Sequence, residues 1–181
     1  MNPRFRVRDP IVLAGCCLIS LITACTRSQG RAGIYMRYSV PFSVFRTSQL
    51  ASHVRAGRAD GFEFPLLEYY NRTGRRVYAG HEARANLLAL QDIRKLEDTP
   101  PLTASPSLGE TMAEVDKAAP GVPFSVPAGE GAILAMDLDR CQACSLQDDY
   151  LSSIKAQLLR DGISIVIVDI VRTPDRTAKG K

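Results

Sequence analysis

Two cysteines in the second half of the chain are close enough in sequence for their sulfur atoms to react together. Cys141 and Cys144 are separated by Gln142 and Ala143. Such a pair can exchange disulfides with other proteins, because one thiolate attacks and the second cysteine resolves the mixed disulfide. It can also close into a static disulfide in an oxidising compartment, or supply two ligands to a metal ion. The spacing alone leaves all three roles open.

The rest of the chain offers little to complete a metal site or another kind of active site. His53 and His81 are the only histidines, and no second cysteine pair has the ligand spacing of zinc sites. Ser145 follows Cys144, whereas the usual haem attachment motif needs a histidine there. The sequence contains no Ser-His-Asp pattern and no Gly-rich phosphate loop. We therefore expect no metal and no cofactor.

The N-terminal segment predicts export. Arg4, Arg6 and Arg8 precede an apolar run over residues 11–24, which is the layout of a secretory signal peptide. This run is 14 residues long and polar residues follow at once, whereas a transmembrane helix needs about 20 apolar residues. The run ends Ile-Thr-Ala-Cys at residues 22–25 and resembles the lipobox of bacterial lipoproteins, in which the cysteine is acylated and the chain is cut before it.

This resemblance implies that residues 1–24 are removed and that the mature protein begins at Cys25, which carries lipid. The protein is then held on a membrane of the cell envelope and faces the periplasm, with the inner and outer membranes both left open. A less favourable lipobox at residues 13–16 and an uncleaved anchor helix are the alternatives. Cleavage before Cys25 leaves Cys141 and Cys144 as the only thiols, in a compartment where disulfides persist.

Length and charge narrow the class of protein further. The mature part has 157 of the 181 residues, which suits one domain. The whole chain carries a net charge of +4, and its arginines are spread rather than interleaved with aromatic residues. We therefore expect no nucleic-acid partner.

Hydrophobic periodicity places strands and helices on both sides of a Pro-rich segment. Before it we predict a strand over 34–40 that Phe42 to Phe45 could extend, a short helix to about residue 56, a hairpin over 66–70 and 75–79, and a helix over 82–96. After it we predict a helix over 110–118, a strand over 132–138, a helix that opens at the cysteine pair, and a buried strand over 163–171. The chain thus divides into signal peptide (1–24), tether (25–33), first half (34–97), linker (98–108), second half (109–171) and tail (172–181).

The predicted hairpin is the clearest local structure. Asn71 and Gly74 tolerate the backbone angles of its turn. We expect Arg72, Arg75 and Arg76 to form its solvated tip.

The second half resembles the active-site half of the thioredoxin superfamily. A strand runs into the cysteine pair at a helix start, and the helix is followed by Gly162 and a buried strand. The resemblance implies that Cys141, at the helix N-terminus, is the nucleophile and that Cys144 resolves the mixed disulfide. It covers about residues 120–171.

The first half resembles the other part of the same fold. Residues 64–74 resemble the segment in which a cis proline faces the cysteines and begins a hairpin, which makes Pro65 the candidate cis proline in the substrate-binding position. The two halves would then form a thioredoxin-like three-layer α/β fold with a central mixed sheet, in circularly permuted order. Two incomplete half-domains are the alternative.

The sequence also departs from the thioredoxin pattern. There is no Trp, and the carboxylate that thioredoxins bury six residues before the first cysteine would fall at Ala135. Asp137 and Asp139 are nearby but offset, and Asp139 would disfavour a thiolate that Arg140 favours.

Two functions follow from these observations. The first is a lipid-anchored thiol–disulfide oxidoreductase that acts through Cys141 and Cys144 on cysteines of exported proteins or on a membrane redox partner. The second is a noncatalytic thioredoxin-like lipoprotein that serves as a binding or assembly part of an envelope or secretion machine.

Overall fold

The computed structural model describes residues 32–54, 61–121 and 125–172. The predicted signal peptide, Cys25, the start of the tether and most of the tail lie outside the described residues. Among the described residues, no helix is both long and apolar enough to cross a membrane.

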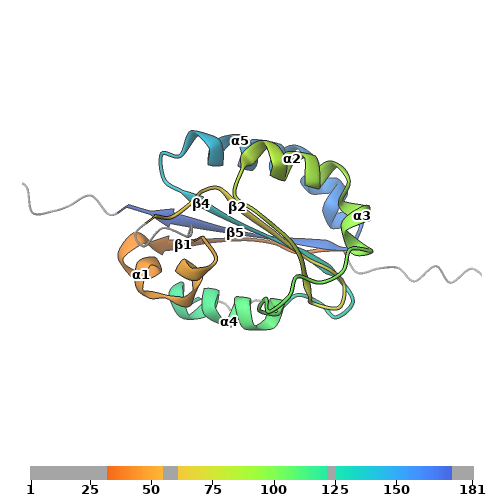
Figure 1. Cartoon of the computed structure of the whole chain (residues 1–181), viewed down its shortest axis with the longest axis horizontal. Coiled ribbons are helices and arrows are strands. Elements are labelled where there is room, and N and C mark those ends of the chain that lie inside the picture. The colour runs from red at the N-terminus through yellow and green to blue at the C-terminus, as the bar shows by residue number, and fades with distance from the viewer. Residues whose placement is uncertain (1–31, 55–60, 122–124, 173–181) are drawn as a thin grey trace, which may run out of the picture.

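Five strands of the described chain form one mixed sheet (Figure 1). The strands are β1 Tyr35–Pro41, β2 Leu66–Tyr70, β3 Arg76–Gly80, β4 Gly131–Leu138 and β5 Ile163–Val171. Their order across the sheet is β1-β5-β4-β2-β3, in which β1, β5 and β4 are parallel and β2 and β3 run antiparallel to their neighbours. The predicted α/β class with a central mixed sheet is confirmed.

The sheet joins the two predicted halves. Strand β2 of the first half pairs with β4 of the second, with Leu66 opposite Met136. Strand β1 of the first half pairs with β5 of the second, with Tyr35 opposite Ile165. Neither half therefore has a sheet of its own.

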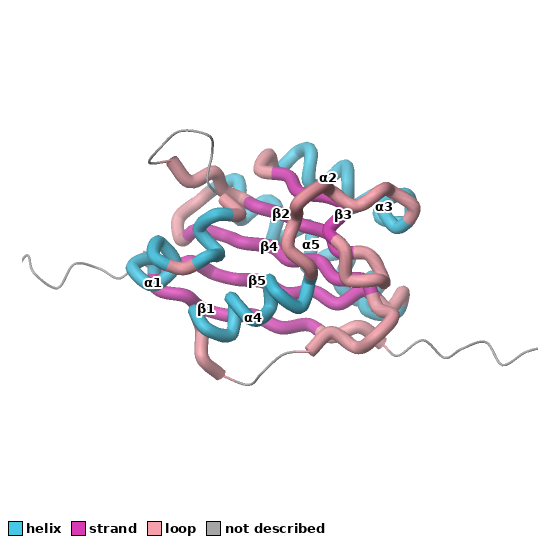
Figure 2. Tube along the Cα trace, turned by 60° about the horizontal axis from the view of Figure 1, so that its bottom comes forward, coloured by secondary structure: helices cyan, strands magenta, loops and turns pink. Residues whose placement is uncertain are grey.

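Helices cover both faces of the sheet (Figures 1 and 2). They are α1 Phe42–Thr47, the 3-10 helix η1 Gln49–Ser52, α2 Ala83–Gln91, α3 Ile93–Glu97, α4 Leu108–Ala118 and α5 Gln142–Arg160. One face packs against α1, η1 and α4, and the other against α2, α3 and α5. Strand β5 is buried between these layers, as its run of branched aliphatic residues predicts.

Several predicted elements differ from the observed ones. The short helix predicted to about residue 56 is instead the 3-10 helix η1, which ends at Ser52. The segment Phe42 to Phe45, expected to extend the first strand, is instead helix α1, because the chain turns at Pro41 and buries the ring of Phe45 against Phe62 and Phe64. The helix predicted over residues 82–96 is broken at Asp92 into α2 and α3. After this break, the side chain of Ile93 packs into the core.

The predicted Pro-rich linker connects α3 to α4 and lies along the hairpin. The backbone N–H of Leu102 donates to the carbonyl of Arg76 at 2.8 Å, and that of Leu108 donates to the carbonyl of Gly74 at 2.9 Å. Helix α4 begins two residues earlier than predicted because Ser107 and Glu110 form a capping box at its start.

Candidate functional site

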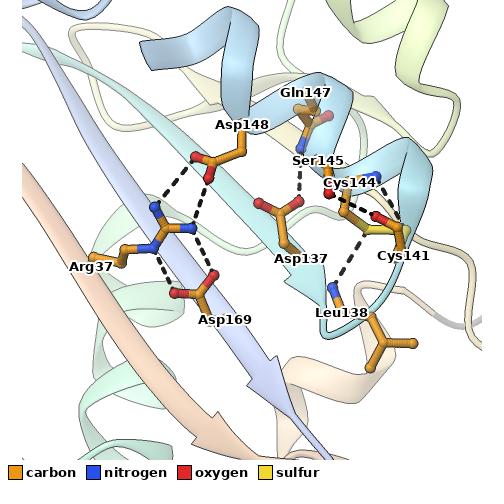
Figure 3. A network of polar contacts seen from close by, with 9 residues as sticks. All are labelled: Arg37, Asp137, Leu138, Cys141, Cys144, Ser145, Gln147, Asp148 and Asp169. Carbon is orange, nitrogen blue, oxygen red and sulfur yellow. Dashed lines mark hydrogen bonds and ion pairs between the residues drawn. A yellow bond between two sulfur atoms is a disulfide. The ribbon is translucent and has the colours of Figure 1, made fainter.

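The cysteine pair lies where strand β4 turns into helix α5 (Figure 3). Cys141 and Cys144 form a disulfide, with their Cα atoms 5.2 Å apart. The turn between β4 and the helix contains Arg140, whose φ of 64° is one of two positive values outside glycine among the described residues. This turn places Cys141 at the N-cap position of α5.

The two cysteines differ in exposure and in the amides that face them. Cys141 is partly exposed, whereas Cys144 is 3% exposed. The Sγ atom of Cys141 accepts a hydrogen bond from the backbone N–H of Cys144 at 3.1 Å. A negative charge on this sulfur would therefore be stabilised both by that amide and by the dipole at the N-terminus of α5. The Sγ atom of Cys144 faces the N–H of Leu138 at 3.5 Å.

Asp137 is a buried carboxylic acid beside this disulfide. Its side chain is on β4 and faces α5, and one oxygen, Oδ1, accepts a hydrogen bond of 3.4 Å from Gln147. Its other oxygen, Oδ2, has no hydrogen-bond partner among the described residues. Burial, together with the negative charges of Asp148 and Asp169, raises the pKa of Asp137 to about 7. The group can therefore both hold and release a proton near neutral pH.

Asp137 was not predicted as a site residue, because the thioredoxin pattern puts the buried carboxylate at Ala135. Both side chains point to the same face of β4, since successive residues of a strand alternate. Asp137 is two residues nearer to the cysteines in the sequence than Ala135 is. That alternation was a signal in the sequence that could have identified it.

A charged cluster lies next to Asp137 (Figure 3). Arg37 of β1 binds Asp169 of β5 with Nε–Oδ2 and Nη2–Oδ1 distances of 2.6 and 3.0 Å. The same guanidinium binds Asp148 of α5 with an Nη2–Oδ2 distance of 2.9 Å. Each contact joins residues more than 100 positions apart, so no local pattern in the sequence could predict the cluster.

Gln147 connects the cysteine helix to the rest of the polar interior. It is fully buried, and its Nε2 atom donates to the carbonyl of Leu66 at 3.2 Å as well as to Asp137. Its Oε1 atom accepts a hydrogen bond of 2.7 Å from Asn86 of α2, and Asn86 in turn accepts one from the hydroxyl of Tyr78. These contacts fix α5 against α2 and against the start of β2.

The peptide bond between Phe64 and Pro65 is cis, which confirms the predicted isomer. Pro65 is buried and immediately precedes β2, whose first residue Leu66 pairs with Met136. It therefore lies at the end of the sheet where β4 approaches the cysteines. Pro65 does not belong to the described residues that line the pocket beside the disulfide.

An open pocket of about 390 Å³ adjoins the disulfide. Its wall includes both cysteines, Asp137 and the three members of the charged cluster. In the part of the chain that the structure describes, no group of three or more His, Cys, Asp or Glu side chains could hold a metal ion. His53 binds Glu68 at 3.0 Å, and His81 lies 3.2 Å from the carbonyl of Glu63.

The expectation that Arg76 is a solvated residue of the hairpin tip is wrong. Its side chain is 17% exposed and binds the fully buried Glu68. Glu68 also accepts a hydrogen bond of 2.7 Å from the hydroxyl of Tyr70, and it is bound by His53. Arg72 and Arg75 are exposed, as predicted.

Taken together, fold and site define the class: an α/β protein whose mixed sheet carries a Cys-x-x-Cys disulfide at a helix N-terminus. Comparisons with protein-family models, with curated proteins and with solved structures find no match for this chain.

Proposed function

We propose that this protein is an exported, lipid-anchored thiol–disulfide oxidoreductase that acts on cysteines of envelope proteins or on a membrane redox partner. The observation that carries the proposal is the unequal placement of the two cysteines. Both cysteines line the open pocket, but Cys141 caps the start of α5 and is partly exposed, whereas Cys144 is buried. An accessible attacking sulfur and a shielded resolving sulfur are what disulfide exchange requires.

The arrangement of the elements supports a thioredoxin-like fold with its halves in permuted order. Strand β4, helix α5 and strand β5 form a parallel unit with the cysteines at its strand-to-helix turn. The antiparallel hairpin β2–β3 joins this unit through β4 and is followed by α2. In the thioredoxin pattern the hairpin follows the cysteine unit in sequence, whereas here it precedes it.

The proposed exchange balances two electrons. The thiolate of Cys141 attacks one sulfur of a client disulfide, which forms a mixed disulfide and releases one client thiolate. The thiolate of Cys144 then attacks Sγ of Cys141, which closes the Cys141–Cys144 disulfide and releases the second client thiolate. The client gains two electrons and the cysteine pair loses them. The reverse sequence oxidises a client dithiol.

Asp137 is the proposed proton acceptor for the second step. Cys144 is buried, so its thiol needs a nearby base before its sulfur can attack. Asp137 lines the same pocket, and its pKa of about 7 lets it take a proton at neutral pH and return it when the reaction reverses. Oδ2, the oxygen without a partner among the described residues, is free to act as the acceptor.

The proposed location rests on the N-terminal sequence. Acylation of Cys25 would leave residues 25–33 as a short tether between the membrane and β1. Strands β1 and β4 both run parallel to β5, so the tether would join the sheet at the end opposite the cysteine pair and leave the pair open to exported proteins and to a membrane redox partner. Whether that membrane is the inner or the outer one does not change the chemistry.

Trapping of mixed disulfides tests this function. In the Cys144→Ser variant the attacking sulfur remains and the resolving sulfur is lost, so mixed disulfides should accumulate with exported proteins in cells and with oxidised glutathione in the purified protein. Cys141→Ser is the matched control and should trap neither. If neither variant forms a mixed disulfide, the pair is a structural disulfide and the assembly-component alternative replaces this proposal.

A further inference from the structure

Four carboxylates line the pocket beside the disulfide, and two of them, Asp148 and Asp169, act electrostatically on Asp137. Asp137 and Asp169 are neighbours on the parallel strands β4 and β5, and Asp148 reaches the same place from α5. Two negative charges next to a buried carboxylic acid oppose its ionisation. Asp137 must lose its proton before it can act as a base. The charges of Asp148 and Asp169 oppose that loss unless they are neutralised.

Arg37 supplies the neutralising charge from the edge of the sheet. Its strand, β1, pairs only with β5 among the described strands. From there the guanidinium contacts both oxygens of Asp169 and both oxygens of Asp148, the longest of the four contacts being 3.4 Å. Such bidentate pairs hold the partners in a fixed orientation.

We propose that Arg37 is a positioning residue for disulfide exchange: by binding Asp148 and Asp169 it keeps Asp137 able to accept the proton of Cys144. The inference rests on the function proposed above. Arg37 does not take part in the sulfur chemistry itself, because it acts through the two aspartates. Strand β1, which contributes no cysteine, would thus contribute to disulfide exchange.

The other groups around Asp137 leave Arg37 as the main source of positive charge. Strand β5 contributes Asp169, and α5 contributes Asp148, Cys144 and the neutral Gln147. Strand β2 contributes the carbonyl of Leu66 through Gln147, and the turn after β4 contributes Asp139 and Arg140. The side chain of Arg140 is 90% exposed, and its described partner is Asp139 at 3.8 Å. Among the pocket residues, Arg140 is thus the second cation, and solvent screens its charge.

The test compares Arg37→Met with Arg140→Met in the full lipoprotein purified in detergent. The reduced protein is mixed with oxidised glutathione between pH 5.5 and 9, and acid-quenched samples are analysed by mass spectrometry for the mixed disulfide. The decay of this species reports the resolving step. In the wild-type protein the decay rate should rise with pH and level off above an inflection near the pKa of Asp137.

In Arg37→Met the inflection should move up by about one pH unit, so that decay below it becomes up to about tenfold slower. Arg140→Met, which removes the same charge from the same pocket, should leave the inflection in place. Arg37→Lys keeps the charge and should retain most of the wild-type profile. Adding Asp169→Asn to Arg37→Met should bring the inflection back down, because one of the uncompensated charges is gone.

A second readout separates the possible failures. The carboxyl ¹³C shift of Asp137 follows its protonation directly and does not depend on catalysis. If Arg37→Met raises the pKa of Asp137 but leaves the decay profile unchanged, Arg37 has no role in exchange and the proposal is overturned. An unchanged pKa overturns it as well. If the wild-type protein forms no mixed disulfide at all, the proposed redox function is refuted, and the role proposed for Arg37 is refuted with it.

Discussion

Replacement of Asp137 by asparagine should make the folded protein more stable at alkaline pH, even though it removes a group we place in the mechanism. Asp137 is 6% exposed, and its pKa rises from an ordinary 3.8 to about 7 in the folded state. At pH values between these two pKa values, Asp137 releases its proton in the unfolded chain but keeps it in the folded protein. Folding stability contributed by this site therefore falls as pH rises from about 4 to about 7, and stays at its lowest above that.

The pKa values of Asp137 in the folded and unfolded states determine how much stability is lost. The difference between them corresponds to about 4 kcal/mol of unfolding free energy at pH 8. The asparagine side chain of the Asp137→Asn variant cannot ionise, so the variant avoids this penalty. It must, however, bury an amide donor where Oδ2 now has no partner among the described residues, at a cost of about 1–3 kcal/mol that does not vary with pH. The difference in stability between variant and wild type should thus increase by about 4 kcal/mol from pH 4 to pH 8.

Urea unfolding of the oxidised protein at several pH values measures this difference. Asp139→Asn is the matched control, because its side chain is 42% exposed and it removes the same charge two residues away. That control should shift stability by well under about 1 kcal/mol at any pH. A stability difference between Asp137→Asn and the wild type that stays constant from pH 4 to pH 8 would show that Asp137 ionises normally, and would refute its role as a proton acceptor.

Three further predictions concern other parts of the molecule. Gln147→Leu leaves the buried amide of Asn86 without its acceptor and should lower the unfolding free energy by about 1–3 kcal/mol, measured in urea, whereas the exposed Gln142→Leu should have little effect. Glu68→Gln removes the carboxylate charge that binds Arg76 and should cost about 3 kcal/mol, visible as a lower melting temperature, and a change within error would refute the ion pair. Cys25→Ser should abolish labelling by a fatty-acid analogue in cells, and continued labelling would place the lipid elsewhere.

The regular elements could be predicted because their signals are local. The hairpin turn at Asn71 to Gly74 and the aliphatic run of β5 determine structure through neighbouring residues alone, and both were correctly placed. Helix α1 was missed because its residues suit a strand equally well. What decides its structure is the packing of Phe45 against Phe62 and Phe64, which the local pattern does not contain.

The candidate site was predicted only in part, for a related reason. The cysteines are neighbours in sequence, so their pairing was foreseeable. The contacts of Arg37 with Asp148 and Asp169 arise because β1 pairs with β5, which joins the two ends of the described chain. The sequence near Arg76 did contain a sign that this residue is not solvated. Glu68 interrupts a strand that is otherwise apolar and aromatic, and a buried charge needs a partner such as an arginine.

The redox potential of the Cys141–Cys144 pair tests the central claim most directly. The oxidised protein is equilibrated with glutathione and dithiothreitol buffers of known potential, and the fraction of reduced thiols is counted by alkylation and mass spectrometry. We predict a single two-electron transition between about −270 and −120 mV, the range of thiol–disulfide oxidoreductases. A disulfide that is reduced only below about −300 mV would behave as a structural one. That result would contradict the proposed exchange chemistry.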